Sequence, residues 1–295
     1  MLLAGGQGSR LYDLTKQTAK PAVTFAGKYK IIDFPLSNLV NAGVTKIGIV
    51  TKENYRSLMD HVSNGVSWDL DRKNGGVFFI PPYYKRGVGR LKSTMSSLAG
   101  AAEYIERCGA DYIVLYGSNI IANIDLSAAC KQHKETEADI TVIYHRGELP
   151  DKSTEKMIIN VGEDYRIDKI DFGNVQGEVA FGVGISIINK DLLLKLIEEA
   201  IDEDITSFGH GVLASKINEL KICGYDHTEY VAIMDNTATY FEASMDLLEK
   251  PVRDRLFNRK RPVLTKVRDG MPTRYGTQSN AKNSLIGDNC IIEGT

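Results

Sequence analysis

The sequence predicts an α/β protein with a doubly wound, mostly parallel sheet, followed by the start of a left-handed parallel β-helix. Short β-rich apolar runs alternate with amphipathic helical patterns, which is typical of a mostly parallel sheet covered by helices. The β-rich runs are residues 1–4, 47–51, 112–115, 140–144, 183–188 and 231–233, and the helical patterns are residues 36–42, 55–62, 98–107, 127–135 and 190–200. Near the end of the sequence an aliphatic pair recurs after six residues, the period of a parallel β-helix.

Composition divides the chain into three parts. Residues 1–250 carry the alternating pattern, residues 251–280 are charged and rich in turn formers, and residues 281–295 carry the six-residue repeat. We therefore expect an α/β domain, a linker and the beginning of a β-helix, in that order. A pair of repeats cannot form a stable solenoid, because its coils bury their aliphatic faces only against further coils. The sequence is therefore interpreted as a truncated piece of a longer protein.

The overall composition is that of a globular protein of the cytoplasm. Hydrophobic residues make up 43% of the sequence and charged residues 25%, and the net charge of −2 gives no support to a nucleic-acid or membrane partner. The 4 cysteines lie far apart without a CxxC spacing, which favours reduced thiols over a zinc site. No apolar run approaches the roughly 20 residues that cross a bilayer, and no signal peptide precedes the first strand.

A glycine turn directly after the first strand is the strongest functional signal. Gly5, Gly6 and Gly8 lie there, with Arg10 and Lys20 downstream. Because glycine lacks a Cβ, backbone N–H groups can approach phosphate oxygens, and the two cations can neutralise the remaining charge. The loop lacks the Gly-Lys-Ser/Thr of a Walker A motif and the third glycine of a dinucleotide fingerprint. The pattern predicts a nucleoside triphosphate site at the carboxyl ends of the strands, although the glycines alone fit an ordinary βα turn equally well.

Further motifs make the chain resemble a known enzyme family. The pattern Gly-Gly-x-Gly-x-Arg-Leu with a downstream Lys-Pro-Ala is similar to the signature of sugar-nucleotide pyrophosphorylases. Residues 27–38 and 68–77 resemble the glucose-1-phosphate adenylyltransferase (ADP-glucose pyrophosphorylase) family of bacterial glycogen synthesis. The resemblance implies that ATP binds with Mg²⁺ and that glucose 1-phosphate attacks its α-phosphorus in line, expelling pyrophosphate. In that reaction Arg10 and Lys20 would be the catalytic residues that contact the triphosphate.

The resemblance also implies two metal-binding aspartates, of which this chain keeps one. The family's Leu-x-Gly-Asp-His segment reads Leu-Tyr-Gly-Ser-Asn at residues 115–119, so Ser118 stands in place of the first aspartate. Asp235 corresponds to the second and is the predicted Mg²⁺ ligand. Without the resemblance, one aspartate after a strand is more often a helix cap or a turn residue. Asp125 is the alternative carboxylate for the metal in a fully active enzyme.

Other family contacts are missing from the sequence. A Glu-Lys-Pro segment whose lysine holds the sugar phosphate is absent from residues 169–180, and the same letters at residues 249–251 are interpreted as a helix end. A family Asp-Phe-Gly-Lys reads Ser-Phe-Gly-His at residues 207–210, without either charge. The family's adenine-contacting loop corresponds to residues 86–94, whose three cations are interpreted first as a solvated loop and only second as a phosphate site.

The retained and missing residues together predict a regulatory or weakly active subunit. Residues 55–61 and 119–126 resemble the regulatory D-type subunit of the family, which assembles with a homologous catalytic subunit, whereas the glycine loop resembles the catalytic kind. We expect ATP, and glucose 1-phosphate in an active form, as ligands, and a hetero-tetramer or a homo-oligomer as the assembly. Two alternatives stay open: a fully active enzyme, and a structural scaffold subunit that binds no nucleotide.

Overall fold

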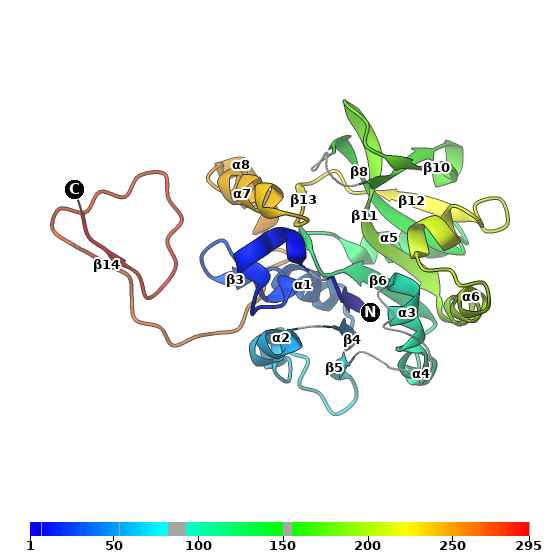
Figure 1. The fold of residues 1–295 in the computed structure, drawn as a ribbon, viewed down its shortest axis with the longest axis horizontal. Helices are drawn as coiled ribbons and strands as arrows, with labels where there is room; N and C mark the ends of the chain where they lie inside the picture. Colours follow the sequence, from blue (N-terminus) through cyan, green and yellow to red (C-terminus); the bar gives the residue numbers. More distant parts are fainter. Residues whose placement is uncertain (7, 53, 82–92, 150–154, 295) are drawn as a thin grey trace.

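A computed structural model describes residues 1–6, 8–52, 54–81, 93–149 and 155–294, most of which fold around one large sheet (Figure 1). The strands are β1 (Leu2–Ala4), β2 (Thr24–Phe25), β3 (Tyr29–Lys30), β4 (Lys46–Thr51), β5 (Gly76–Ile80), β6 (Tyr112–Gly117), β7 (Ile120–Ala122), β8 (Ile140–Glu148), β9 (Lys156–Val161), β10 (Ile167–Gly173), β11 (Glu178–Asn189), β12 (Ile222–Asp226), β13 (Val231–Ile233), β14 (Arg274–Tyr275) and β15 (Ile291–Ile292). The α-helices are α1 (Asp33–Asn41), α2 (Tyr55–Val62), α3 (Thr94–Ala99), α4 (Ala102–Arg107), α5 (Leu126–Glu135), α6 (Lys190–Asp202), α7 (Thr237–Asp246) and α8 (Lys250–Leu256).

The central sheet has a parallel part around β1. Its strand order is β10-β9-β11-β6-β1-β4-β5, and β8 pairs with both β11 and β12. β1 is parallel to β4 and β6, with Leu2 opposite Ile49 and Tyr116, and β5 continues the parallel part beside β4. β11 runs antiparallel to β6 and β8. The predicted α/β fold with a mostly parallel central sheet is therefore confirmed, and the sheet becomes mixed beyond β6.

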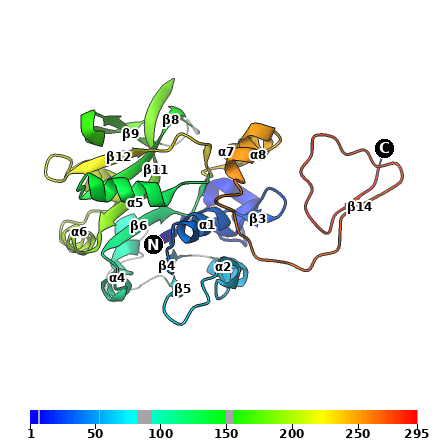
Figure 2. The same ribbon diagram turned by 180° about the vertical axis from the view of Figure 1, so that it is seen from behind.

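Helices cover both faces of this sheet, as Figures 1 and 2 show from opposite sides. Successive residues of a strand point to opposite faces, so Ile49 and Val50 of β4 belong to different core clusters. The cluster around Ile49 receives Leu36, Leu58 and Leu126 from α1, α2 and α5, and the cluster around Val50 receives Leu98, Ile105 and Leu193 from α3, α4 and α6. This arrangement is the predicted doubly wound one. None of the helices in the described ranges is long and apolar enough to span a bilayer.

The structure contains elements that the sequence patterns did not predict, among them β5, β12 and α7, and it differs from these patterns most clearly at one helix and one hairpin. The prediction of a single helix over residues 98–107 is wrong, because α3 ends at Ala99 and α4 begins at Ala102, with Gly100 between them. Glycine disfavours the helix interior by about 1 kcal/mol relative to alanine, and the bend lets both helices pack on α6. The β9–β10 hairpin was not predicted, because charged residues interrupt its apolar pattern.

A third core cluster places α7 and α8 beside the segment that follows the glycine loop. Phe25 and Phe34 pack there with Met234, Leu247 and Leu256, and all five are buried. This packing holds the residues after β13 next to the start of the chain. The predicted domain division at residue 250 stays a prediction; α8 begins at that position and its last residue contributes to this cluster.

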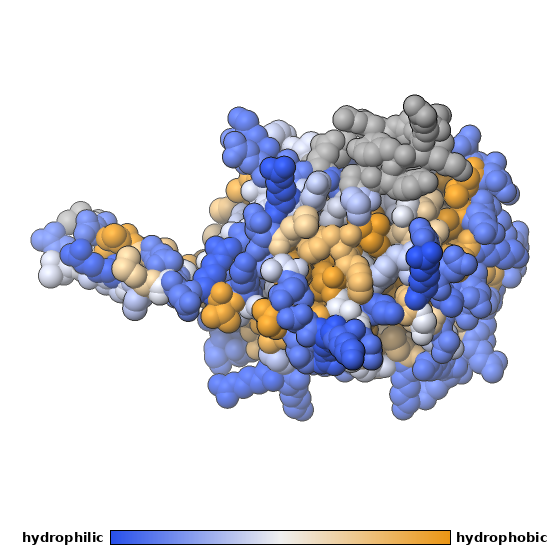
Figure 3. Space-filling view, turned by 90° about the horizontal axis from the view of Figure 1, so that it is seen from below, coloured by the Kyte–Doolittle hydropathy of each residue, from blue (hydrophilic) through white to orange (hydrophobic). Residues whose placement is uncertain are grey.

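Beyond α8 the chain extends away from the body as a tail, visible in Figures 1 and 2. β14 and β15 pair in parallel, with Arg274 opposite Ile291, and the Thr273 hydroxyl donates to the Gly287 carbonyl at 2.6 Å. Leu285 and Ile291 are 42% and 66% exposed, and hydrophobic atoms lie on the tail surface in Figure 3. The parallel pairing is the direction that successive coils of a solenoid use, but the aliphatic residues are not buried. The β-helix therefore stays a prediction.

His227, which follows β12, gives the fold a testable dependence on pH. Burial and then the charge of the neighbouring His145 lower the pKa of its imidazole from 6.5 to about 4, and its Nε2 has no hydrogen-bond partner within the described residues. Below pH 6.5 the unfolded chain takes up a proton that the folded chain accepts only near pH 4. Stability is therefore lost as the pH falls through this window, by about 2 kcal/mol at pH 5.

The check is urea unfolding of wild type and variants at pH 7 and pH 5. We expect His227→Gln to remove most of this loss, because glutamine does not take up the proton in the unfolded state. His210→Gln, at an exposed position on the surface, serves as the matched control and should keep the wild-type loss. An unchanged loss in His227→Gln would contradict the assignment.

Candidate nucleotide site

The glycine loop lies at the carboxyl end of β1, in the parallel part of the sheet, where ligands bind in folds of this kind. Gly8 has a φ of +65°, and a Cβ there would lie 2.9 Å from Thr15 Cγ2, so the position requires glycine. The Thr15 hydroxyl donates to the Gly8 carbonyl at 2.7 Å and holds the loop in this shape. A Cβ at Gly5 would come within 2.9 Å of Lys52 Cε. The Lys52 side chain is flexible and could move aside, so the loop geometry explains Gly8 and does not require glycine at position 5.

The predicted site residues lie together around one open cavity. This cavity has a volume of about 340 Å³ and is lined by Gly5, Gly6, Gly8, Ser9, Arg10, Lys20 and Asp235. The set includes every predicted nucleotide-binding residue and the predicted metal ligand, from segments more than 200 residues apart. A larger cavity of about 830 Å³ lies at the opposite edge of the sheet near Met1 and contains none of the predicted residues.

Lys20 is held at this cavity by the residues that follow β13. It begins the short 3₁₀ helix Lys20–Ala22, and its Nζ donates to the Met234 carbonyl at 3.0 Å and lies 3.9 Å from Asp235 Oδ1. Burial lowers the pKa of its ammonium; the Asp235 carboxylate opposes this shift, and the charges of Lys156 and Arg10 add to it. An anionic ligand would stabilise the charged form of this lysine.

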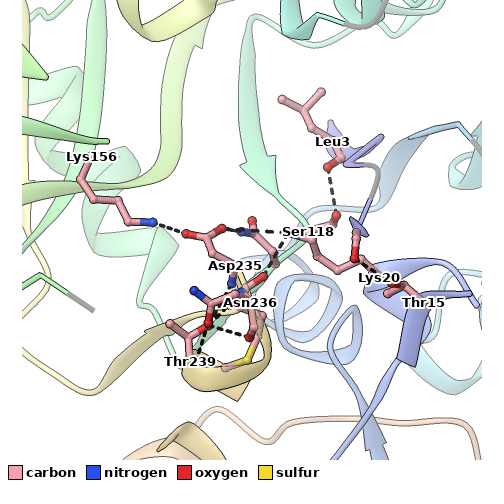
Figure 4. Close-up of polar contacts among 11 residues, drawn as sticks. Leu3, Thr15, Lys20, Ser118, Lys156, Asp235, Asn236 and Thr239 are labelled. Carbon is pink, nitrogen blue, oxygen red and sulfur yellow. Dashed lines mark hydrogen bonds and ion pairs between the residues drawn. The ribbon is translucent and has the colours of Figure 1, made fainter. Parts of the chain in front are cut away.

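Asp235 directs its carboxylate toward cationic and amide donors (Figure 4). Asn236, and not Asp235, caps α7, because its Oδ1 accepts from the Thr239 N–H at 2.9 Å. The interpretation of Asp235 as a helix cap is therefore wrong. Asn119 Nδ2 donates to Asp235 Oδ1 at 3.0 Å, and Lys156 Nζ forms an ion pair with Oδ2. Both carboxylate oxygens are thus engaged.

Neither of the other two positions considered for the metal offers a free carboxylate. Ser118, at the end of β6, is buried, and its hydroxyl donates to the Leu3 carbonyl at 2.9 Å, which ties β6 to β1. Asp125 caps α5 by accepting from the Ala128 N–H at 3.0 Å, and it pairs with Arg261 at 3.2 Å. Asp125 is not among the described residues that line the cavity. The carboxylate of Asp125, the alternative metal ligand, is therefore paired with Ala128 and Arg261 outside the cavity.

The residues at the cavity do not fit an ordinary Mg²⁺ site. Mg²⁺ takes an octahedron of oxygens, commonly one or two carboxylates together with waters and phosphates. Here Asp235 is already paired with Lys156, and the hydroxyl of Ser118 is bonded to the backbone. Among the residues with described coordinates, no group of three or more His, Cys, Asp or Glu side chains could hold a metal ion. Binding of Mg²⁺ by Asp235 stays a prediction.

Two residues of the site were not predicted from the sequence. Lys156 begins β9 and reaches Asp235 from 79 residues away, and no motif around it indicates a role. Asn119 adjoins Ser118, at the position of the family's histidine, so its neighbourhood could have indicated it. Residues 86–92 of the predicted cationic loop lie outside the described ranges. The segment at residues 249–251 does form a helix end, the start of α8.

Comparison with known proteins agrees with this fold. Residues 1–169 match the nucleotidyl transferase family. The glycogen biosynthesis protein GlgD of Bacillus subtilis (strain 168) is 31% identical over 284 residues, which cover 96% of this chain and 73% of that protein. The glucose-1-phosphate adenylyltransferases of Clostridium perfringens (strain 13 / Type A) and Clostridium acetobutylicum are each 34% identical, covering 100% of this chain and 76% and 78% of those proteins. The chain therefore belongs to the nucleotidyl transferase family, within its glucose-1-phosphate adenylyltransferase (ADP-glucose pyrophosphorylase) branch.

Proposed function

We propose that this chain is a regulatory or weakly active subunit of an ADP-glucose pyrophosphorylase that binds ATP and modulates a homologous catalytic subunit. Its place would be glycogen biosynthesis in the cytoplasm, in a hetero-tetramer or a homo-oligomer. The observation that carries the proposal is that the site keeps its predicted phosphate-binding residues but, among its described residues, lacks free carboxylates for a metal. The glycine loop, Arg10 and Lys20 line an open cavity, while Ser118 stands at the place of a carboxylate and Asp235 is neutralised by Lys156.

ATP binding is supported by the charge around the cavity. Arg10 and Lys20 line it, Lys156 lies directly behind Asp235, and one carboxylate balances only part of their charge. Charge-assisted hydrogen bonds to phosphate are among the stronger polar interactions in proteins. The site therefore favours a polyanion, and the glycine loop leaves room for it. Nucleotidyl transferases use Mg²⁺ with their nucleotides, so the cation can also arrive on the phosphates of ATP.

Weak catalysis is supported by what the same cavity lacks. Expulsion of pyrophosphate places developing negative charge on the leaving group, which must be met by positioned cations in the transition state. A hydroxyl at Ser118 cannot hold a divalent ion as a carboxylate does, and this hydroxyl is bonded to Leu3. The expected result is a chain that binds its nucleotide better than it converts it.

A fully active adenylyltransferase is the second candidate function. Identity to the clostridial enzymes and the presence of both Arg10 and Lys20 favour it. Calorimetric titration with ATP, followed by an assay of ADP-glucose formation by the full-length protein, separates the functions. Binding with slow turnover supports the regulatory subunit, and binding with turnover near 10 per second, about the median for enzymes, supports the active one. No binding supports a structural scaffold subunit.

Lys20→Ala should weaken ATP binding by about tenfold to a hundredfold, because a charge-assisted contact contributes roughly 1.5 to 3 kcal/mol. Lys16→Ala is the matched control, since Lys16 is exposed, lies on the same segment and does not line the cavity. Calorimetry with ATP measures both variants against wild type. Equal affinity of wild type and Lys20→Ala would remove the site assignment.

A further inference from the structure

Lys156 is a buried lysine whose side chain reaches the edge of the nucleotide cavity. It is the first residue of β9, only 8% exposed, and its ammonium forms an ion pair with Asp235 Oδ2. In Figure 4, Lys156 and Lys20 lie on either side of the Asp235 carboxylate. A buried ammonium is costly unless it is paired, so the ion pair with Asp235 stabilises this lysine in its buried position. The pair therefore joins β9 to the edge of the nucleotide cavity.

The position of this ammonium matters because of what else surrounds Asp235. Oδ1 accepts from Asn119 at 3.0 Å and lies 3.9 Å from Lys20 Nζ, so donors contact both oxygens. A divalent ion would need one of these oxygens, and no second carboxylate lies among the described cavity residues. The carboxylate is thus arranged as the counter-ion of a lysine.

The same arrangement leaves the cavity positive without any metal. The charges of Lys156 and Arg10 act on Lys20, and among the described residues around it Asp235 is the carboxylate that opposes them. Three cations around one carboxylate give a net positive charge. A triphosphate entering the cavity meets this charge directly, as it does in sites that bind phosphate through lysine and arginine alone.

We propose that Lys156 takes the place of the divalent metal at this site, so that the protein binds ATP without Mg²⁺. The ammonium is tethered by β9 and fixed by Asp235, and it supplies positive charge where a carboxylate-held metal would otherwise lie. This inference rests on the proposed nucleotide site. It adds that the site is built for binding and not for turnover, because a fixed monocation carries half the charge of Mg²⁺ and cannot act as a Lewis acid.

The test is calorimetric titration of the full-length protein with ATP, once with EDTA and once with excess Mg²⁺. The wild type should bind ATP in EDTA with an affinity within about threefold of that in Mg²⁺, or more tightly. Lys156→Met should bind ATP at least about tenfold more weakly in EDTA, since a positive charge beside the cavity is removed. Mg²⁺ should recover part of the affinity for ATP that the variant has lost, because the Asp235 carboxylate is no longer paired with Lys156 and can hold the metal.

Three further variants make the test specific. Lys156→Arg keeps the charge and should bind ATP in EDTA much as the wild type does. Lys169→Ala removes a surface lysine of the neighbouring strand β10, paired with Asp171, and should leave binding unchanged. If Lys156→Met fails to fold, Lys156→Gln keeps a polar amide beside Asp235 while removing the charge, and it should show the same loss of affinity in EDTA.

The outcomes separate this inference from the function on which it rests. ATP binding by the wild type only when Mg²⁺ is present overturns the role of Lys156 and leaves the nucleotide site intact. If Lys156→Met binds ATP in EDTA as tightly as the wild type does, the proposed role of Lys156 is likewise overturned and the nucleotide site stays intact. Absence of ATP binding in both buffers overturns the nucleotide site, and the inference falls with it.

Discussion

The full-length protein, purified without a partner, should form ADP-glucose at least about a hundredfold more slowly than a catalytic homologue. Metal stabilisation of a transferring phosphoryl group contributes several kcal/mol to catalysis, and about 2.7 kcal/mol already corresponds to a hundredfold. Ser118 and the paired Asp235 give this chain no ordinary metal site to supply that stabilisation. The measurement is the initial rate of ADP-glucose formation from saturating ATP, glucose 1-phosphate and Mg²⁺.

Ser118→Asp should recover only part of this deficit. The carboxylate restores one possible metal ligand, but Lys156 still neutralises Asp235, and the Glu-Lys-Pro lysine for the sugar phosphate is absent from residues 169–180. Ser118→Ala is the control, because it removes the bond to Leu3 without adding a charge. A wild-type rate of roughly 10 per second in the absence of a partner would contradict the regulatory function.

Asp33→Ala should lower the free energy of unfolding by about 2 to 5 kcal/mol, because it leaves two donors in the interior without an acceptor, at roughly 1 to 3 kcal/mol each. Asp33 is fully buried at the start of α1. Its Oδ1 lies 2.5 Å from His61 Nε2, and its Oδ2 accepts from the Lys30 N–H at 2.8 Å. The substitution leaves both groups without their acceptor. Urea unfolding measures the change, with Asp60→Ala on the exposed face of α2 as control.

The double variant Asp33→Ala/His61→Phe distinguishes the buried pair from a general packing effect. Removing both partners should cost less than the sum of the two single changes, because the imidazole of His61 is then no longer left unpaired in the interior and only the Lys30 N–H loses its acceptor. A loss below about 1 kcal/mol for Asp33→Ala would show that the pair does not hold α1 against α2.

The fold could be predicted because its signals are local. The alternation of strands and helices is present in the sequence, and β4, β6, β8 and α6 lie where their apolar runs lie. The glycine loop was predictable for the same reason, since the positive φ of Gly8 and its contact with Thr15 arise within one segment. Where a local signal was weak, as at Gly100 or in the β9–β10 hairpin, the prediction was wrong or missing.

The site could be predicted only in part, because the position of Lys156 and the role of Asp235 depend on tertiary packing. Asp235 was identified by resemblance, but its partner Lys156 comes from a hairpin whose position depends on pairing with β11. The residues next to Lys156 in the sequence do not indicate that its side chain pairs with a carboxylate 79 residues away. The distinction between Asp235 and the cap Asn236 likewise needed the geometry of α7.

A single-turnover experiment tests most directly the central claim that this site binds nucleotide but converts it slowly. Full-length protein in excess is mixed with labelled ATP, Mg²⁺ and glucose 1-phosphate; protein-bound label is collected on a filter, and the nucleotide is identified after rapid quenching. We expect label to be retained as ATP, with conversion to ADP-glucose slower than about 0.1 per second, a hundredfold below the median enzyme rate. A burst of ADP-glucose at roughly 10 per second, or no retained label, would contradict the claim.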